Sequence, residues 1–259
     1  YGLSTYNGQN YPFGTYLFGG IDPNFDGTLN ITGGKLSYGQ MVPWQTVYSN
    51  GIRLAYTKGN FNMSGGTLDV KGNLFIDSTM DFQMTGGSIY LDGNSPQTDT
   101  TYILHGYPIF ELHGAQPGKS IQITGGDIYI LNPTRFDDYS FKSFSRRLNT
   151  ATNLAGSTIH FGKSDMNESD ISYNQTLVLG TLNQPTGFKV YTGENNGTQW
   201  PVPMGNVVID GNDGISGRRH VFVDYGFHAK RDVTINPNSE WRLYYSQHEQ
   251  YIGGQSSTQ

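Results

Sequence analysis

FQMTGGSIYL, residues 82–91, is the stretch that decides the fold, because close copies of it recur along the chain. The intact copies are LNITGGKLSY from Leu29, FNMSGGTLDV from Phe61 and IQITGGDIYI from Ile121, and a degenerate copy, TNLAGSTIHF, starts at Thr152. Each intact copy has alternating apolar residues on both sides of a glycine pair. A short strand, a bend and a second short strand, repeated, are typical of a fold built by stacking.

The copies start 32, 21, 39 and 31 residues apart. The shortest step fits one coil of a parallel β-helix, which has roughly three short strands and three bends. A longer step then indicates a coil with an insert, or two coils of which one lacks the phrase. Because the side chains of a strand alternate between its faces, we expect Leu29, Ile31, Leu36 and Tyr38 to point inward and Asn30 outward.

Two positions of the phrase predict columns of stacked side chains. Coils of such a fold lie about 4.8 Å apart, so equivalent residues lie over one another, and stacked amides can hydrogen-bond along the column. The second position is an amide in every copy: Asn30, Asn62, Gln83, Gln122 and Asn153. The fourth position is a hydroxyl residue in the intact copies and Ala155 in the degenerate one: Thr32, Ser64, Thr85 and Thr124.

These patterns predict an all-β chain, folded as a right-handed parallel β-helix with lateral loop inserts and roughly eight to ten coils. We expect one domain over 1–259, with a cap or loop at 1–28, coils at 29–245 and a tail at 246–259. The sequence begins at Tyr1 without an initiator Met or a signal peptide, which favours a mature product or a segment of a longer protein. Further strands are expected at 101–105, 109–113, 158–161, 176–180 and 187–191, at 206–210 and 232–236, which match at a spacing of 26 residues, and at 220–224.

The composition excludes several classes of protein. Charged residues make up 14% of the chain, against about 25% in a typical soluble domain, and the net charge is −5. No stripe of Lys and Arg is present to neutralise phosphates, so we expect no nucleic-acid partner. The absence of Cys excludes disulfides and thiolate metal sites. No apolar run approaches 18 residues, so we expect no transmembrane segment.

One short motif resembles the start of a calcium-binding loop. Asp22, Asn24 and Asp26 precede Gly27 and place oxygen ligands at alternate positions. An EF-hand is excluded, because Gly33 stands where its bidentate Glu would be. A smaller calcium site and a solvated turn both remain open, and no other cofactor is expected. A second turn of the same kind is predicted at Asp210, Asn212, Asp213 and Gly214, and the same two interpretations apply to it.

For catalysis, the densest polar group comprises Arg218, Arg219, His220, Asp224, Lys230 and Arg231. His220 and Asp224 would share the outer face of one strand, where parallel β-helix lyases and hydrolases place acids and bases. Glycosidase chemistry needs two carboxylates that flank a groove, and no obvious pair lies in this region. We therefore interpret the group as a solvated polar face and assign no catalytic residue.

Three stretches interrupt the ladder: 1–20, 39–60 with Trp44, and 131–150, in which Phe136, Tyr139, Phe144 and Leu148 have loosely helical spacing. Inserts on one side of a solenoid often carry binding. Alternatively, the stretches cover an apolar edge. Trp44, Trp200 and the tyrosines of these stretches could stack on sugar rings, or the tyrosines could simply fill strand positions, being half apolar and half hydrogen-bonding.

LNITGG, GNVVIDG and RDVTINPNSEWRL resemble the β-strand repeats of large bacterial surface proteins, the adhesin-like substrates of the type IX secretion system. The resemblance covers most of 29–245. It implies export through that secretion machinery, a secreted or cell-surface location and an adhesive or structural role. It also implies sites of O-glycosylation, to which Asp77-Ser78-Thr79 and Asp99-Thr100-Thr101 conform.

We therefore expect a non-catalytic adhesin or structural protein that binds surface glycans or partner proteins through its inserts. The alternative is a β-helix polysaccharide lyase or glycoside hydrolase, including a tailspike-like depolymerase. An ice-binding solenoid is less favoured, because regular T-x-T strand arrays are absent.

Overall fold

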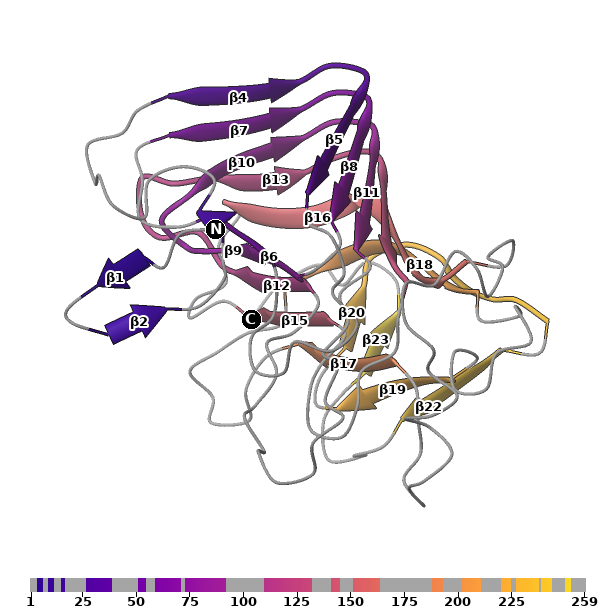
Figure 1. Ribbon diagram of the computed structural model, residues 1–259. Helices are drawn as coiled ribbons and strands as arrows, with labels where there is room; N and C mark the ends of the chain where they lie inside the picture. The colour runs from indigo at the N-terminus through magenta and orange to yellow at the C-terminus, as the bar shows by residue number, and fades with distance from the viewer. Residues whose placement is uncertain are drawn as a thin grey trace.

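The computed structural model describes residues 4–6, 9–11, 15–16, 27–38, 51–54, 59–70, 73–91, 110–131, 141–144, 151–163, 188–192, 202–210, 220–224, 227–237, 239–243 and 250–252. These residues form strands and bends, and no helix is found among them. The described part of the chain is therefore all-β (Figure 1).

The first twelve strands run from the N-terminus to the middle of the chain. They are β1 (Ser4–Tyr6), β2 (Gln9–Tyr11), β3 (Thr15–Tyr16), β4 (Thr28–Ile31), β5 (Lys35–Tyr38), β6 (Gly51–Leu54), β7 (Asn60–Met63), β8 (Thr67–Val70), β9 (Asn73–Ile76), β10 (Asp81–Met84), β11 (Ser88–Leu91) and β12 (Phe110–His113). The others are β13 (Ile121–Ile123), β14 (Asp127–Ile130), β15 (Phe141–Phe144), β16 (Thr152–Gly162), β17 (Phe188–Thr192), β18 (Met204–Asp210), β19 (His220–Asp224), β20 (Phe227–Ala229), β21 (Val233–Ile235), β22 (Glu240–Leu243) and β23 (Gln250–Ile252).

From β3 on, strands that follow one another in sequence do not pair with each other. A 13-stranded sheet has a first arm of β4, β7, β10, β13 and the start of β16, and a second arm of β5, β8, β11, β14, the end of β16, β18 and β21. Its remaining strands are β20, which pairs with the start of β18, and β23, which pairs with β20. Figure 1 shows the two arms meeting at an angle at a row of bends. A third sheet has eight strands in the order β22-β19-β17-β15-β12-β9-β6-β3. All described pairs in these two sheets are parallel, and only β1 and β2 pair antiparallel.

The register of the first arm confirms the predicted amide column. Asn30 lies opposite Asn62, which lies opposite Gln83, and the column continues through Gln122 to Asn153. The predicted match between 206–210 and 232–236 is also confirmed, because Val207 pairs with Val233 and Ile209 with Ile235. Equivalent positions of the repeat therefore stack without an offset.

One apolar core is shared by both arms and the third sheet. Phe61 and Phe82 stack in it with ring centroids 4.8 Å apart and an interplanar angle of 7°. Full burial of such a side chain contributes about 1.5–3 kcal/mol. Leu29, Leu36 and Tyr38 pack against the core but are only half-buried, because β4 and β5 end the strand order of the 13-stranded sheet.

The bends between the arms depend on glycine. The second glycine of each intact copy has a positive φ: Gly34 (70°), Gly66 (75°), Gly87 (87°) and Gly126 (87°). Residues other than glycine rarely adopt this backbone conformation. The bends also stack on one another, since Ser88 N donates to Gly66 O at 3.0 Å and Asp127 N donates to Gly87 O at 3.0 Å.

The degenerate copy is built differently. β16 runs through its corner as one 11-residue strand, with a register shift against β18 between Leu154 and Thr158. Ser157 stands where the intact copies have their second glycine, and it is fully buried with its hydroxyl donating to Leu154 O at 2.8 Å.

The prediction of an all-β fold with parallel strands is confirmed, while the closed right-handed coil stays a prediction. The strands expected at 109–113, 158–161, 187–191 and 220–224 correspond to β12, part of β16, β17 and β19. Those expected at 101–105 and 176–180 lie outside the described residues. The helical spacing read in 131–150 is wrong at Phe144, which belongs to strand β15, because Phe141–Phe144 pairs with both β12 and β17.

Candidate functional site

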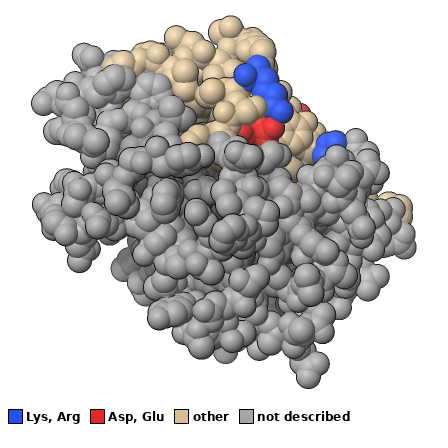
Figure 2. Space-filling model, in the orientation of Figure 1, with Lys and Arg blue, Asp and Glu red and all other residues tan. Residues whose placement is uncertain are grey.

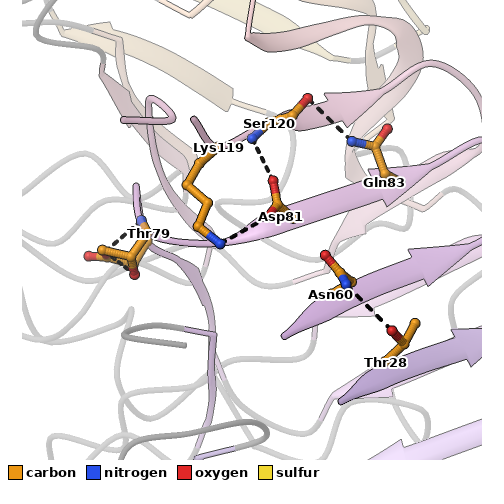
Figure 3. Close-up of polar contacts among 8 residues, drawn as sticks. Thr28, Asn60, Thr79, Asp81, Gln83, Lys119 and Ser120 are labelled. Atoms are coloured by element: carbon orange, nitrogen blue, oxygen red, sulfur yellow. Dashed lines mark hydrogen bonds and ion pairs between the residues drawn. The ribbon is translucent and has the colours of Figure 1, made fainter. Parts of the chain in front are cut away.

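The outer face of the first arm carries three columns of polar residues. One column is the amide column. The other two are formed by the residues two positions before each amide and two positions after it, at the corner. Because positions two apart lie on the same face of a strand, all three columns point away from the core. Figure 3 shows several of these side chains standing on the same side of neighbouring strands. The columns are Thr28, Asn60, Asp81 and Ser120; Asn30, Asn62, Gln83, Gln122 and Asn153; and Thr32, Ser64, Thr85 and Thr124.

The amides make contacts within this face. Asn62 Nδ2 donates to Asn30 Oδ1 at 3.0 Å, which is the expected bond between stacked amides. Gln83 Nε2 instead donates to Ser120 Oγ at 3.3 Å (Figure 3). Asn60 Nδ2 donates to Thr28 Oγ1 at 3.4 Å in the neighbouring column. The face is therefore held in a fixed arrangement by its own side chains.

One ion pair lies at the border of this face. Lys119 Nζ is 2.9 Å from Asp81 Oδ2, and the backbone N–H of Ser120 donates to Asp81 Oδ1 at 2.9 Å (Figure 3). Both oxygens of the carboxylate thus have a donor, and its charge is neutralised by the neighbouring ammonium.

The outer face of the second arm carries a stack of rings. Tyr90 and Tyr129 lie with centroids 4.6 Å apart, and Tyr129 and His160 with centroids 4.2 Å apart. His160 Nε2 lies 3.0 Å from Asp127 Oδ1, and Lys35 Nζ lies 2.6 Å from Asp69 Oδ2. On the face shown in Figure 2, blue and red atoms gather at one border of the described residues, and the other described residues in view are uncharged.

The ring stack limits what this second face can bind. In a stack with interplanar angles of 5° and 15°, each inner ring face is covered by the next ring. A sugar that stacks on an aromatic ring needs an open ring face. The stack therefore presents ring edges and polar atoms to a ligand, and it also stabilises the arm itself.

A third polar group lies at the ends of the paired strands β9 and β12 of the third sheet. Glu111 Oε1 is 2.7 Å from His113 Nε2, and Asp77 Oδ2 is 3.7 Å from His113 Nδ1. The Phe75 ring packs edge-on against His113 with centroids 4.8 Å apart. Asp77 Oδ1 also accepts from the N–H and the hydroxyl of Thr79, at 3.0 and 2.9 Å. A histidine between two carboxylates is an arrangement that acid–base chemistry can use.

Sequence reasoning missed both the ring stack and the histidine cluster. The stack occupies the ninth position of the phrase, so the copies did carry a signal for it. The cluster joins Asp77, at the end of β9, to the alternate residues Glu111 and His113 of β12. Neither strand contains a copy of the phrase, so only the pairing of β9 with β12 brings these residues together.

The structure describes only some of the residues that the sequence singled out as candidate site residues. Asp22, Asn24 and Asp26 lie outside the described residues, as do Asn212 and Asp213. Asp210 ends β18, and its Oδ1 accepts from Asn236 Nδ2 at 2.9 Å, so it joins neighbouring strands. In β19, His220 is in register with Glu240 and Asp224 with Tyr191. No group of three or more His, Asp or Glu residues in the described part of the chain could hold a metal ion.

No family model matches this chain, and no curated protein and no solved structure matches it either. The resemblance to adhesin-like repeats therefore stays a prediction. Within the described residues, no helix is long and apolar enough to cross a membrane.

Proposed function

We propose that the chain is part of a right-handed parallel β-helix that serves as a non-catalytic scaffold on a secreted or cell-surface adhesin. In this proposal its inserts bind surface glycans or partner proteins, and type IX secretion machinery exports the whole protein. The repeats form the rod, and the segments between them present the binding residues.

The constant register carries this proposal. The copies of the phrase start between 21 and 39 residues apart, yet the same positions of the phrase pair in every described case. Residues added between copies therefore do not shift the ladder, which is the behaviour of inserts that leave a stack sideways. A right-handed coil is favoured, since connections between parallel strands of one sheet are almost always right-handed.

A glycan panel tests the proposed function. We expect the protein to bind at least one immobilised glycan without releasing products from it, and Trp44→Ala, in the segment between β5 and β6, to weaken that binding. The unfolding midpoint of the variant should stay within a few degrees of the parent. Lack of binding to every glycan and to a panel of cell-surface proteins would refute the adhesive role.

A second candidate is a β-helix polysaccharide lyase or hydrolase, favoured by the cluster of Glu111, His113 and Asp77 on the third sheet. Its test is the appearance of new reducing ends or unsaturated products from soluble polysaccharides. Turnover that disappears in Glu111→Gln, while the fold is retained, would replace the non-catalytic proposal with this one.

A further inference from the structure

We propose that the outer face of the first arm is itself a binding surface, and that its ligand is an extended, electrically neutral polysaccharide chain. This inference goes beyond the proposed function, which assigns binding to the inserts. Its basis is the set of three polar columns that start at Thr28, Asn30 and Thr32.

The columns are accessible to a ligand. The corner residues of the intact copies are all exposed: Thr32, Ser64, Thr85 and Thr124. The neighbouring amides Asn62 and Gln83 are half-buried. A ligand would therefore meet an exposed row of hydroxyl groups beside a less exposed row of amides.

The chemistry of the columns suits a hydroxyl-rich ligand. A primary amide has two donor hydrogens and an acceptor oxygen, and a hydroxyl both donates and accepts. The bond from Asn62 to Asn30 uses one donor of Asn62, which leaves its second N–H and its oxygen as groups that a sugar hydroxyl could bond. Sugar hydroxyls likewise donate and accept, so the two surfaces are complementary.

The charge of the face selects against ionic polymers. Asp81 is paired with Lys119, and the residues of the amide and corner columns are all uncharged. The second arm differs, because its outer face carries the pair Lys35–Asp69 and the exposed Asp232. An anionic or cationic polysaccharide would find no counter-charge in the amide and corner columns, whose only charged neighbours are the paired Asp81 and Lys119 at the border of the face.

The spacing of the columns sets the direction of the ligand. Equivalent groups recur about every 4.8 Å across the strands, and neighbouring columns lie about 7 Å apart along them. A long chain that crosses the strands would meet the same donor and acceptor at each coil. The affinity would then grow with the number of coils that the chain spans.

The test compares two pairs of Thr→Val substitutions, which keep the shape of the side chain and remove the hydroxyl. Thr85→Val with Thr124→Val changes the first arm, and Thr67→Val with Thr234→Val is the matched control on the second arm. Binding is measured by affinity electrophoresis in gels with a linear neutral β-glucan, with polygalacturonate or with chitosan. Unfolding midpoints establish that both variants fold.

We expect retention by the neutral β-glucan that persists in 0.5 M NaCl, because the contacts are uncharged. The first-arm variant should raise the dissociation constant about thirtyfold, since two hydrogen bonds of about 1 kcal/mol each are lost and about 1.4 kcal/mol is a factor of ten. The control should bind like the parent, and Thr85→Ser with Thr124→Ser should restore most of the affinity.

Equal binding by the first-arm variant and the parent would overturn this inference. If that binding fell in Trp44→Ala, the inserts would be the site and the proposed function would stand. Retention only by a charged polymer, abolished by salt, would also overturn the inference and would point to the second arm. Slowed growth of ice crystals without binding to the glucan would identify ice as the ligand instead.

Discussion

The intact corners and the degenerate corner both lead the chain from the first arm to the second, but with different backbone conformations. At Gly66, Gly87 and Gly126 the chain turns sharply from the first arm to the second with a positive φ. At Ser157 it passes from one arm to the other within a single strand, β16. A bend of positive φ and a β-bulge can both redirect a strand, but only the first requires glycine.

The difference separates the roles of the two glycines. The first glycine is kept in all five copies. In every copy after the first, a Cβ there would meet the backbone of the preceding corner; at Gly65 it would lie 2.7 Å from Thr32 O, and at Gly86 2.8 Å from Ser64 O. The second glycine is lost only where the positive-φ bend is lost. Close stacking thus requires both glycines, since a Cβ at Gly66 or Gly87 would also meet the preceding corner, and the sharp turn additionally requires the second.

The largest expected effect is that of Gly87→Ala. Its new Cβ would lie 2.8 Å from Gly65 C and Gly66 O, and φ is 87°. The positive φ costs about 1–2 kcal/mol and the overlap about 1–3 kcal/mol. We expect urea unfolding to show a loss of about 2–5 kcal/mol.

Gly34→Ala is the matched control for that change. Gly34 has a φ of 70° at the same position of the phrase, but a Cβ there would meet nothing within 4 Å. It should cost only the conformational part, about 1–2 kcal/mol. Equal losses in the two variants would mean that the corners do not stack closely.

Much of this fold could be predicted from the sequence, because ladder positions are repeated and strand pairing is parallel. The columns of Asn62 and Thr85 follow from aligning the copies alone. The third sheet was harder to predict from the sequence, since neither β9 nor β12 contains a copy of the phrase and their register depends on the length of the chain between them. The cluster of Asp77, Glu111 and His113 therefore needed the structure.

The second prediction addresses the degenerate corner through Gly156→Ala. Here a Cβ would overlap the backbone of Thr124, while no positive φ is involved. We expect a loss of about 1–3 kcal/mol, from overlap alone. A neutral result in the same urea titration would show that the bulge of β16 leaves room for a side chain, and that the first glycine has no packing role at this corner.

The third prediction asks whether the lost glycine can be restored. Ser157→Gly removes the hydrogen bond from the buried hydroxyl to Leu154 O and adds freedom to the unfolded chain. We expect a loss of about 1–2 kcal/mol rather than a gain. Ser157→Ala removes the hydrogen bond without adding a glycine, so it should lose less. Stabilisation by Ser157→Gly would indicate that the glycine bend of the intact copies is more stable than the present backbone at this corner too.

The smallest expected effect lies beside the corners, in the amide column. Asn62→Ala removes the bond to Asn30 Oδ1 on the outer face, where water can replace it. We expect a loss of about 0.5–1 kcal/mol in urea unfolding. Asn153→Ala is the informative partner, because Asn153 Oδ1 accepts from Ala155 N within the degenerate corner itself, at 2.9 Å. That bond holds the local backbone, so its loss should cost more than the loss at Asn62. The reverse order would mean that the amides stabilise the stack between coils more than they stabilise the bulge.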